Sequence, residues 1–249
     1  MSGPYKLIVS DVDGCIAPEE SAAWDLAAFG RLAALVRGRE GGAPLPLVLC
    51  TGRPQPYVEV LMKLLDVRFP AICESGAVIY TLHDNRCRFG PGVTEEGLSQ
   101  LREIKRFIVH DLVPRCPYAS YQFGKEAHLS LFSENPDRLA PLADEIRAFA
   151  KRFGDEAIEI GSSHYYLNIS LSGVTKGSAL RQLVSEIGVA REEIAAIGDT
   201  AGDLPLREEA AFFAVPANAT ADVKARADYV SPHADVRGVI DILGRITVS

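Results

Sequence analysis

The sequence lacks long apolar runs, basic runs and internal repeats, and these absences exclude several classes of protein. No apolar segment approaches the roughly 20 residues that cross a bilayer, so we expect no membrane association. The 249 residues carry a formal net charge of -7 at pH 7, without a cluster rich in lysine and arginine. We therefore expect neither a nucleic-acid partner nor binding to an anionic membrane.

The cysteines are few and scattered, which excludes a disulfide framework and a zinc site. None of the five lies in a CxxC pair, and their number is odd. This spacing is typical of reduced thiols. No apolar leader precedes the first predicted strand, so we expect a cytoplasmic protein. The cysteines are Cys15, Cys50, Cys73, Cys87 and Cys116.

Short apolar runs alternate with helical patterns near both ends of the chain. Hydrophobic residues make up 47% of the sequence, which is enough to bury a core. The runs are continuous rather than alternating, as in strands covered on both faces. Strands separated by helices predict an α/β fold with a doubly wound, Rossmann-like parallel sheet. The runs are "KLIVSD", "LPLVLCTG", "PAICESG", "IAAIGD", "AFFAVPAN" and "ADYVSP".

The middle of the chain breaks this alternation. Two long helical patterns there flank a strand, and an alternating, hairpin-like stretch follows them. We expect residues 84–172 to form an α+β domain inserted into a core made of residues 1–83 and 173–249. Its antiparallel sheet would pack one face on the helices and leave a polar face uncovered.

The first apolar run ends in a close pair of carboxylates. In "LIVSDVDGCIAP", one residue separates Asp11 from Asp13, and Gly14 follows. Like charges repel, and a buried carboxylate without a partner is costly. The pattern fits either a plain Asp-Gly turn after a strand, or two carboxylates that hold a cation or a reacting phosphoryl group.

Polar residues also follow the later runs, and they favour the second alternative. The carboxyl ends of parallel strands meet at one edge, which would gather four aspartates, a hydroxyl, a lysine and an arginine. Carboxylate oxygens are ligands for Mg²⁺, while lysine, arginine and helix N-termini bind phosphate. The additional residues are Thr51, Gly52, Arg53, Glu74, Ser75, Lys176, Asp199 and Asp203.

Together these segments resemble the four motifs of the haloacid dehalogenase superfamily, in the same order. The motifs are Asp11-Val-Asp13-Gly14, Thr51-Gly52-Arg53, Thr175-Lys176-Gly177 and Gly198-Asp199 with Asp203. The insert lies between the second and the third, as in the subgroup with an α/β cap of the second type, which includes Cof-like sugar phosphatases and sucrose-phosphatase. "CESGAVIY" is similar to the segment that precedes this cap.

The resemblance implies catalytic roles for five residues. Asp11 would be the nucleophile, and Asp13 the general acid and base. Thr51 and the Gly52 amide would hold the phosphoryl oxygens, and Lys176 would stabilise the transferring charge.

The resemblance also implies a Mg²⁺ cofactor. Its ligands would be Asp11, the backbone carbonyl of Asp13, Asp199 and, through water or a second layer of contacts, Asp203. The chain departs from common relatives at Gly202, where asparagine is frequent, and at Cys15, where threonine is usual. Neither change removes a group that makes or breaks a bond.

Candidate substrate contacts come from both parts of the chain. Besides Gly52, the core offers Arg53 and Ser75, of which Ser75 replaces a common asparagine. An ordinary solvent-facing sheet is the alternative for the candidates of the inserted domain. Those candidates are Lys125, His128, His164, Tyr166 and Asn168.

These residues predict a Mg²⁺-dependent phosphomonoester hydrolase with an aspartyl-phosphate intermediate. The resemblance implies a small phosphorylated substrate, such as a sugar phosphate or sugar-acid phosphate, and a cap that closes over it. One alternative is a sugar phosphomutase, which would return the phosphoryl group to another hydroxyl. Further alternatives are a sugar-phosphate-binding regulator without turnover and a signalling receiver module, although the receiver has its acidic, threonine and lysine residues in a different order.

Overall fold

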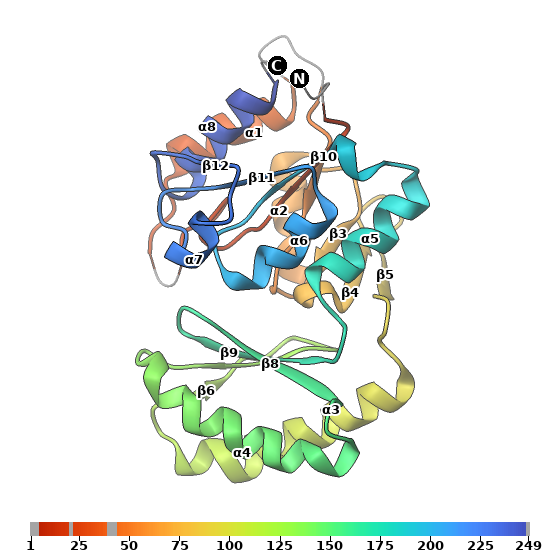
Figure 1. The fold of residues 1–249 in the computed structure, drawn as a ribbon, viewed down its shortest axis with the longest axis vertical. Coiled ribbons are helices and arrows are strands. Elements are labelled where there is room, and N and C mark those ends of the chain that lie inside the picture. The colour runs from red at the N-terminus through yellow and green to blue at the C-terminus, as the bar shows by residue number, and fades with distance from the viewer. Residues whose placement is uncertain (1–4, 20–21, 39–43, 248–249) are drawn as a thin grey trace.

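A five-stranded parallel sheet forms the centre of the larger part of the molecule (Figure 1). This computed structural model describes residues 5–19, 22–38 and 44–247. The strand order is β12-β11-β10-β1-β2, so the predicted doubly wound parallel core is confirmed. The strands are β1 (Leu7–Ser10), β2 (Leu47–Leu49), β10 (Ile194–Ile197), β11 (Phe212–Val215) and β12 (Tyr229–Val230).

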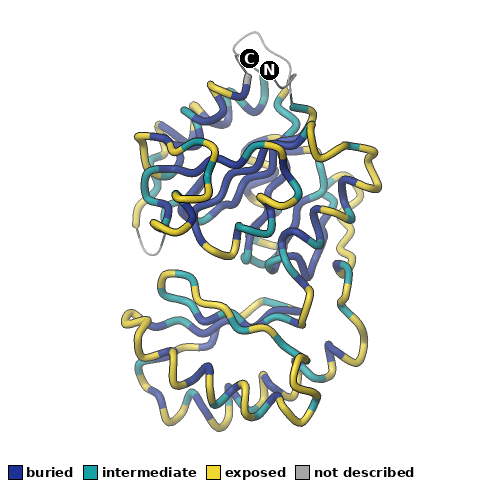
Figure 2. Tube along the Cα trace, viewed as in Figure 1, coloured by how far each residue is buried: buried dark blue, intermediate teal, exposed yellow. Residues whose placement is uncertain are grey.

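Helices cover both faces of this sheet because its strands are apolar on both sides. Ile8 of β1 packs in one cluster with α1, α2 and α8, while Leu7 and Val9 pack in another with α5, α6 and α7. The buried strands run through the centre of this part in Figure 2. The helices are α1 (Leu26–Val36), α2 (Gln55–Leu65), α5 (Lys176–Ile187), α6 (Leu204–Glu209), α7 (Ala221–Lys224) and α8 (Asp235–Thr247).

The "PAICESG" run differs from its predicted place in the parallel sheet. Its strand β3 (Ala71–Cys73) meets the preceding strand only through one parallel bridge, between Cys50 and Ile72. It pairs instead with β4 (Val78–Thr81), which pairs with β5 (Arg86–Phe89), both in antiparallel register. Strand β5 lies within residues 84–172, so the first segment assigned to the insert pairs with the core.

A separate antiparallel sheet lies opposite the parallel one. Its strand order is β6-β7-β9-β8, and helices α3 and α4 pack on one face with a hydrophobic cluster of their own. In β9, Leu167 and Ile169 are buried in this cluster, and the alternate residues are only partly buried. The elements are α3 (Glu95–Phe107), β6 (Ser120–Tyr121), β7 (Leu129–Phe132), α4 (Ala140–Ala150), β8 (Ile158–Ser163) and β9 (Tyr166–Leu171).

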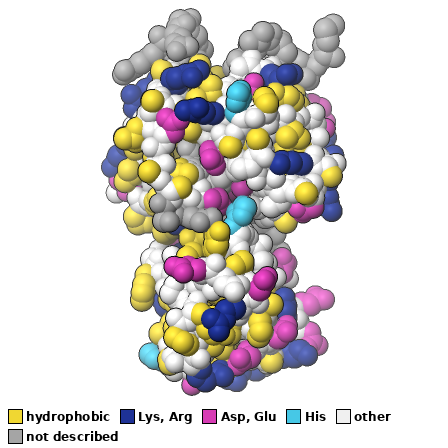
Figure 3. Space-filling view, turned by 90° about the vertical axis from the view of Figure 1, so that its left-hand side faces the viewer, with side chains coloured by type: hydrophobic (Ala, Val, Ile, Leu, Met, Phe, Trp, Pro, Cys, Tyr) yellow, Lys and Arg dark blue, Asp and Glu magenta, His cyan; other side chains and the backbone are white. Residues whose placement is uncertain are grey.

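A waist separates the two parts of the molecule in the side view of Figure 3, and acidic and histidine side chains lie along it. The uncovered face of the antiparallel sheet is turned toward the core in Figure 1. No helix within the described ranges combines the length and hydrophobicity needed to span a bilayer.

Two leucines of α1 provide a test of the packing of the parallel sheet. Leu32 is fully buried, whereas Leu26 is 73% exposed. We expect Leu32→Ala to lower the free energy of unfolding by about 2–5 kcal/mol, because it leaves a cavity. The matched Leu26→Ala should change it by less than about 0.5 kcal/mol, since little packing is lost. Urea unfolding measures both, and similar losses would contradict the burial described.

Candidate active site

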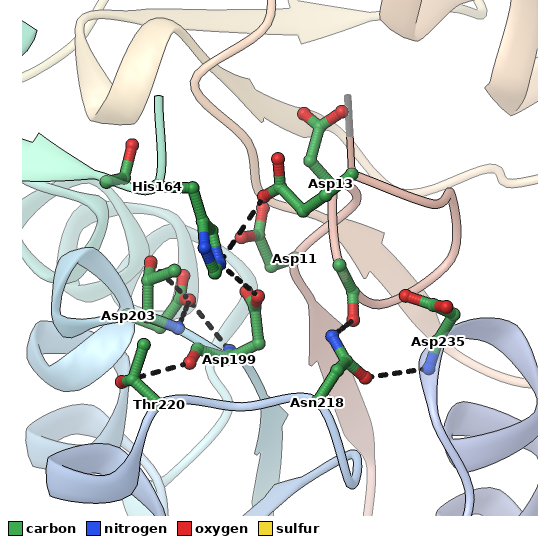
Figure 4. Close-up of polar contacts among 12 residues, drawn as sticks. Asp11, Asp13, His164, Asp199, Asp203, Asn218, Thr220 and Asp235 are labelled. Atoms are coloured by element: carbon green, nitrogen blue, oxygen red, sulfur yellow. Dashed lines mark hydrogen bonds and ion pairs between the residues drawn. The ribbon is translucent and has the colours of Figure 1, made fainter. Parts of the chain in front are cut away.

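One edge of the parallel sheet gathers the predicted residues, because β1 and β10 are adjacent parallel strands (Figure 4). Asp11 directly follows β1, and Asp199 lies two residues beyond β10. Lys176 is the first residue of α5. A capping box fixes this helix start: Ser178 N donates to Thr175 Oγ1 at 3.0 Å, and Thr175 N donates to Ser178 Oγ at 3.0 Å.

The buried ammonium of Lys176 joins two of the aspartates. Its Nζ lies 2.8 Å from Asp11 Oδ1 and donates to Asp203 Oδ1 at 2.6 Å. The other oxygen of Asp203 accepts the backbone N–H groups of Asp199 and Thr200, at 3.0 and 3.1 Å. Burial alone would lower the pKa of Lys176, but Asp11 and Asp203 outweigh it and raise that pKa well above its usual range. Asp203 is therefore saturated by protein donors.

Asp199, unlike Asp203, has no hydrogen-bond donors from the described residues on its carboxylate. Both of its carboxylate oxygens are buried, and neither accepts a hydrogen bond within the described part of the chain. The nearest cationic candidate is His164, whose Nε2 lies 3.5 Å from Asp199 Oδ2 (Figure 4). The carboxylate can lie here only because residue 14 is glycine: a Cβ on Gly14, which has φ +73°, would lie 2.1 Å from Asp199 Oδ2.

The charges of this cluster do not balance. Asp11, Asp199 and Asp203 place one oxygen each within 4.8 Å of one another, and Lys176 is the ammonium that pairs with two of them. Burial raises the pKa of Asp199, and burial with the Asp203 charge raises that of Asp11. An arrangement of carboxylates with two unpartnered buried oxygens suits a hard cation such as Mg²⁺.

Asp13 is paired with an arginine rather than with this cluster. Arg53 Nε donates to Asp13 Oδ2 at 2.8 Å, and Nη2 donates to Oδ1 at 2.7 Å. This bidentate pair raises the pKa of Arg53 above its usual range. Both side chains lie in the wall of the cavity next to Asp11.

Thr51, Gly52 and Ser75 surround the turn that follows β2. The Thr51 hydroxyl accepts the N–H of Arg53 at 3.1 Å, so its own proton is available to another acceptor. Thr51 is fully buried behind the cavity wall, whereas Gly52 and Ser75 form part of that wall.

A cavity of about 550 Å³ lies between the two parts, and part of the predicted site lines it. Its wall combines Asp11, Asp13 and Lys176 of the core with residues from the antiparallel sheet. Four of the five predicted contacts of the insert are in it: Lys125, His128, Tyr166 and Asn168.

His164 lies elsewhere than predicted. It occupies the turn between β8 and β9 with φ +39° and is directed at Asp199 instead of forming part of the cavity wall (Figure 4). The turn carries its side chain across the waist, so the alternation of β9 does not determine where it points.

Two glutamates take part in the site in ways that were not predicted: Glu74 was placed at this edge without a role, and Glu19 was not named. Glu74 is buried, and its carboxylate accepts the backbone N–H groups of Glu126 and Ala127. Glu19 lines the cavity, with His164 Nε2 at 4.0 Å. Glu74 does stand at a strand end, which is a signal, but its partners lie more than fifty residues away. Nothing in the sequence around Glu19 marks it.

The sequence and the fold were compared with known proteins. A family model described as haloacid dehalogenase-like hydrolase matches residues 103–243. The chain is 26% identical over 242 residues to a phosphoglycolate phosphatase of Methanothermobacter thermautotrophicus, covering 96% of this chain and 98% of the relative. It is 26% identical over 199 residues to the phosphoglycolate phosphatase of Archaeoglobus fulgidus, covering 80% and 82%.

Solved structures share the fold. A Thermoplasma acidophilum protein has a TM-score of 0.73 and 21% identity, with 99% of this chain and 100% of that chain covered. A haloacid dehalogenase-like hydrolase from Bacteroides thetaiotaomicron has a TM-score of 0.70 and 23% identity, with 97% and 99% covered. At these identities the likeness concerns the fold.

The environment of the Glu19 carboxyl should make the free energy of unfolding depend on pH. Burial, and then the Asp13 charge, raise the pKa of Glu19 to about 7, from roughly 4.3 in an unfolded chain. Between these values the folded state holds a proton that the unfolded state has released, so stability falls as pH rises from about 5 to about 7. We expect Glu19→Gln to make this slope shallower, because unfolding of the variant would release up to about one proton fewer. Urea unfolding in chelator at stepped pH measures it, and an unchanged slope would mean that Glu19 is solvated.

Proposed function

Because the chain belongs to the family of haloacid dehalogenase-like hydrolases, we propose that it is a Mg²⁺-dependent phosphatase acting on a small phosphomonoester through an aspartyl-phosphate. Its class, a phosphatase, is that of relatives which align with nearly the whole chain. The observation that carries the proposal is Asp11, buried in the cavity wall between Lys176 and the Asp199 oxygens, which accept no hydrogen bond in the described chain.

The hydrogen bonds of Asp11 leave one oxygen for attack. Lys176 Nζ and the N–H of Val12 both address Oδ1, at 2.8 and 2.7 Å. Oδ2 is the oxygen that would bond to phosphorus. The ammonium of Lys176 favours the ionised form of Asp11, against the burial and the Asp203 charge that raise its pKa. Lys176 would also stabilise negative charge on the phosphoryl group.

The buried Asp199 carboxylate, whose oxygens accept no hydrogen bond in the described chain, supports a divalent cation at this place. Asp199 and Asp11 would be its side-chain ligands, together with the Asp13 carbonyl that the family resemblance implies, and Asp203 would hold Lys176 and the loop around Asp199 in place. When bound, Mg²⁺ would offset the charge on the phosphoryl oxygens.

Asp13 is the candidate proton donor to the leaving alcohol and the base for the water that attacks next. In this structure Arg53 holds both of its oxygens. Substrate therefore has to loosen this pair, and an anionic phosphoryl group that binds Arg53 would do so. The hydroxyl proton of Thr51 and the Gly52 amide would bind the remaining phosphoryl oxygens, next to Ser75.

The leaving group would be a small sugar or sugar acid. A cavity of about 550 Å³ suits a metabolite of this size, and two relatives are named phosphoglycolate phosphatases. We propose that residues 84–172, apart from β5, act as a cap whose polar sheet face contacts the leaving group.

Asp11→Asn tests the nucleophile. We expect Mg²⁺-dependent phosphate release to fall by at least about 1,000-fold, because an amide oxygen is a poor nucleophile. Asp222→Asn, an exposed change in α7, is the control and should retain full activity. The measurement is free phosphate released from a panel of sugar phosphates and phosphorylated acids. An isomerised sugar phosphate in place of phosphate would show a mutase, and residual turnover near the wild-type value would contradict the assignment of Asp11.

Asp199→Asn tests the cation site without an activity assay. In chelator the variant should have a free energy of unfolding about 1–3 kcal/mol higher, because it removes a buried charge whose oxygens accept no hydrogen bond in the described chain. Mg²⁺ should stabilise the wild type much more than the variant, whose affinity we expect to fall at least 10-fold. Equal stabilisation of both proteins by Mg²⁺ would place the cation elsewhere.

A further inference from the structure

Lys125 lies in the cap wall of the cavity without a carboxylate partner. It belongs to the loop between β6 and β7, and no described Asp or Glu oxygen lies within ion-pair distance of its Nζ. By contrast, Arg53 and Lys176, the other cations of this wall, are each paired with an aspartate. An ammonium in a partly desolvated wall is costly unless an anion compensates it.

A directed chain of hydrogen bonds holds this ammonium in position. Lys125 Nζ donates to Ser130 Oγ at 2.6 Å, and Ser130 Oγ donates to Asn168 Oδ1 at 2.8 Å. Asn168 Nδ2 then donates to Ser163 Oγ at 3.0 Å. The chain crosses three strands, so Lys125 is fixed to the sheet rather than solvated at the end of a loop.

His128 supplies a second donor beside Lys125. Its Nδ1 lies 3.2 Å from Lys125 Nζ, and since an ammonium can only donate, Nδ1 accepts and Nε2 carries the proton. Burial, with the nearby Lys125 charge, lowers the pKa of His128 well below its usual range, so the ring is neutral. Nε2 is buried, in a residue 1% exposed, and has no hydrogen-bond partner in the described chain.

The core fixes the loop that carries both donors. The Glu74 carboxylate accepts the N–H of Glu126 at 3.0 Å and that of Ala127 at 2.8 Å. Glu74 and Ser75 reach this position in left-handed conformations, with φ +51° and +57°. The Glu74 carboxylate thus holds the backbone of this loop, and no ion pair in the described chain joins it to Lys125.

We propose that Lys125 and His128 bind a carboxylate of the leaving group, so that the enzyme prefers phosphorylated acids to phosphorylated alcohols of the same skeleton. A carboxylate offers two acceptor oxygens to these two donors and one negative charge to the single ammonium. A sugar hydroxyl would leave that charge uncompensated. A second phosphate group would carry roughly two negative charges, one more than the single ammonium can compensate. The inference rests on the phosphatase function proposed above and assigns its specificity.

Two matched substrate pairs test the proposal. The acids are 2-phosphoglycolate and 3-phosphoglycerate, and the alcohols with the same skeletons are 2-hydroxyethyl phosphate and glycerol 3-phosphate. We expect wild-type kcat/KM to favour each acid by about 10- to 100-fold, the range of a charge-assisted hydrogen bond. Lys125→Met should remove most of this preference by lowering kcat/KM for the acids at least about 10-fold more than for the alcohols. Lys151→Met, an exposed change in the same cap, should keep the preference.

A pH profile separates recognition from a structural role. Burial lowers the pKa of Lys125 to about 8, with Glu74 and Asp13 acting against it and Arg53 with it, while the adjacent His128 stays neutral. The wild-type preference for acids should therefore fall as pH rises past about 8, because the ammonium loses its charge. In Lys125→Met this step should be absent.

The outcomes distinguish this inference from the function on which it rests. If wild-type protein hydrolyses acids and alcohols equally, or hydrolyses sugar phosphates and neither acid, the specificity site is overturned and the phosphatase stands. If Lys125→Met loses acids and alcohols alike, Lys125 serves cap placement, which also overturns the proposal. If no phosphorylated compound releases phosphate, the proposed function fails and takes the inference with it.

Discussion

The ion pair between Lys176 and two aspartates is the constraint on which the site depends. It joins the end of β1, the start of α5 and the loop after β10 through one buried nitrogen. Removing one partner of such a group leaves a buried charge uncompensated. The fold supports the pair at close quarters: a Cβ on Gly76, which has φ +107°, would lie 2.1 Å from the carbonyl oxygen of Thr175, so only glycine lets α5 begin there.

The two aspartates of the loop after β10 have different hydrogen-bond partners. Asp203 has both oxygens occupied by protein donors and holds the loop, whereas Asp199, four residues earlier, has none. Two residues of one type in one short loop therefore have opposite chemistry, set by which of them the backbone amides reach. Asn218 adds to this arrangement by donating to the Gly14 carbonyl at 2.8 Å and accepting from Asp235 N, so α8 is tied to the first loop (Figure 4).

The core could be predicted from the sequence because parallel strands bring their carboxyl ends together whatever the details of packing. That rule suffices for Asp11, Asp199 and Asp203, which follow two adjacent strands of the sheet. Lys176 is the first residue of α5, so a helix start, and not a strand end, is the signal that points to it. The strand-end rule fails for contacts across the waist. Glu74 binding the loop at residues 126–127 depends on how two separately formed sheets face each other, and neither hydrophobic period nor motif spacing encodes that. The same holds for His164.

The pairing of β3 with β4 was missed because a short apolar run has the same pattern in a parallel and in an antiparallel sheet.

The strand register has a consequence for how the molecule is made. Leu7 pairs with Ile194, so the first strand of the core, which has β2 on one side, gains its other neighbour β10 only after the whole insert has been synthesised. The antiparallel strands β6 to β9 need only residues 120–171 to pair among themselves. A growing chain therefore holds β1 and β2, both buried in the finished fold, without β10 throughout that interval. Until β10 emerges, β1 keeps an unpaired edge, and such an edge is prone to aggregation.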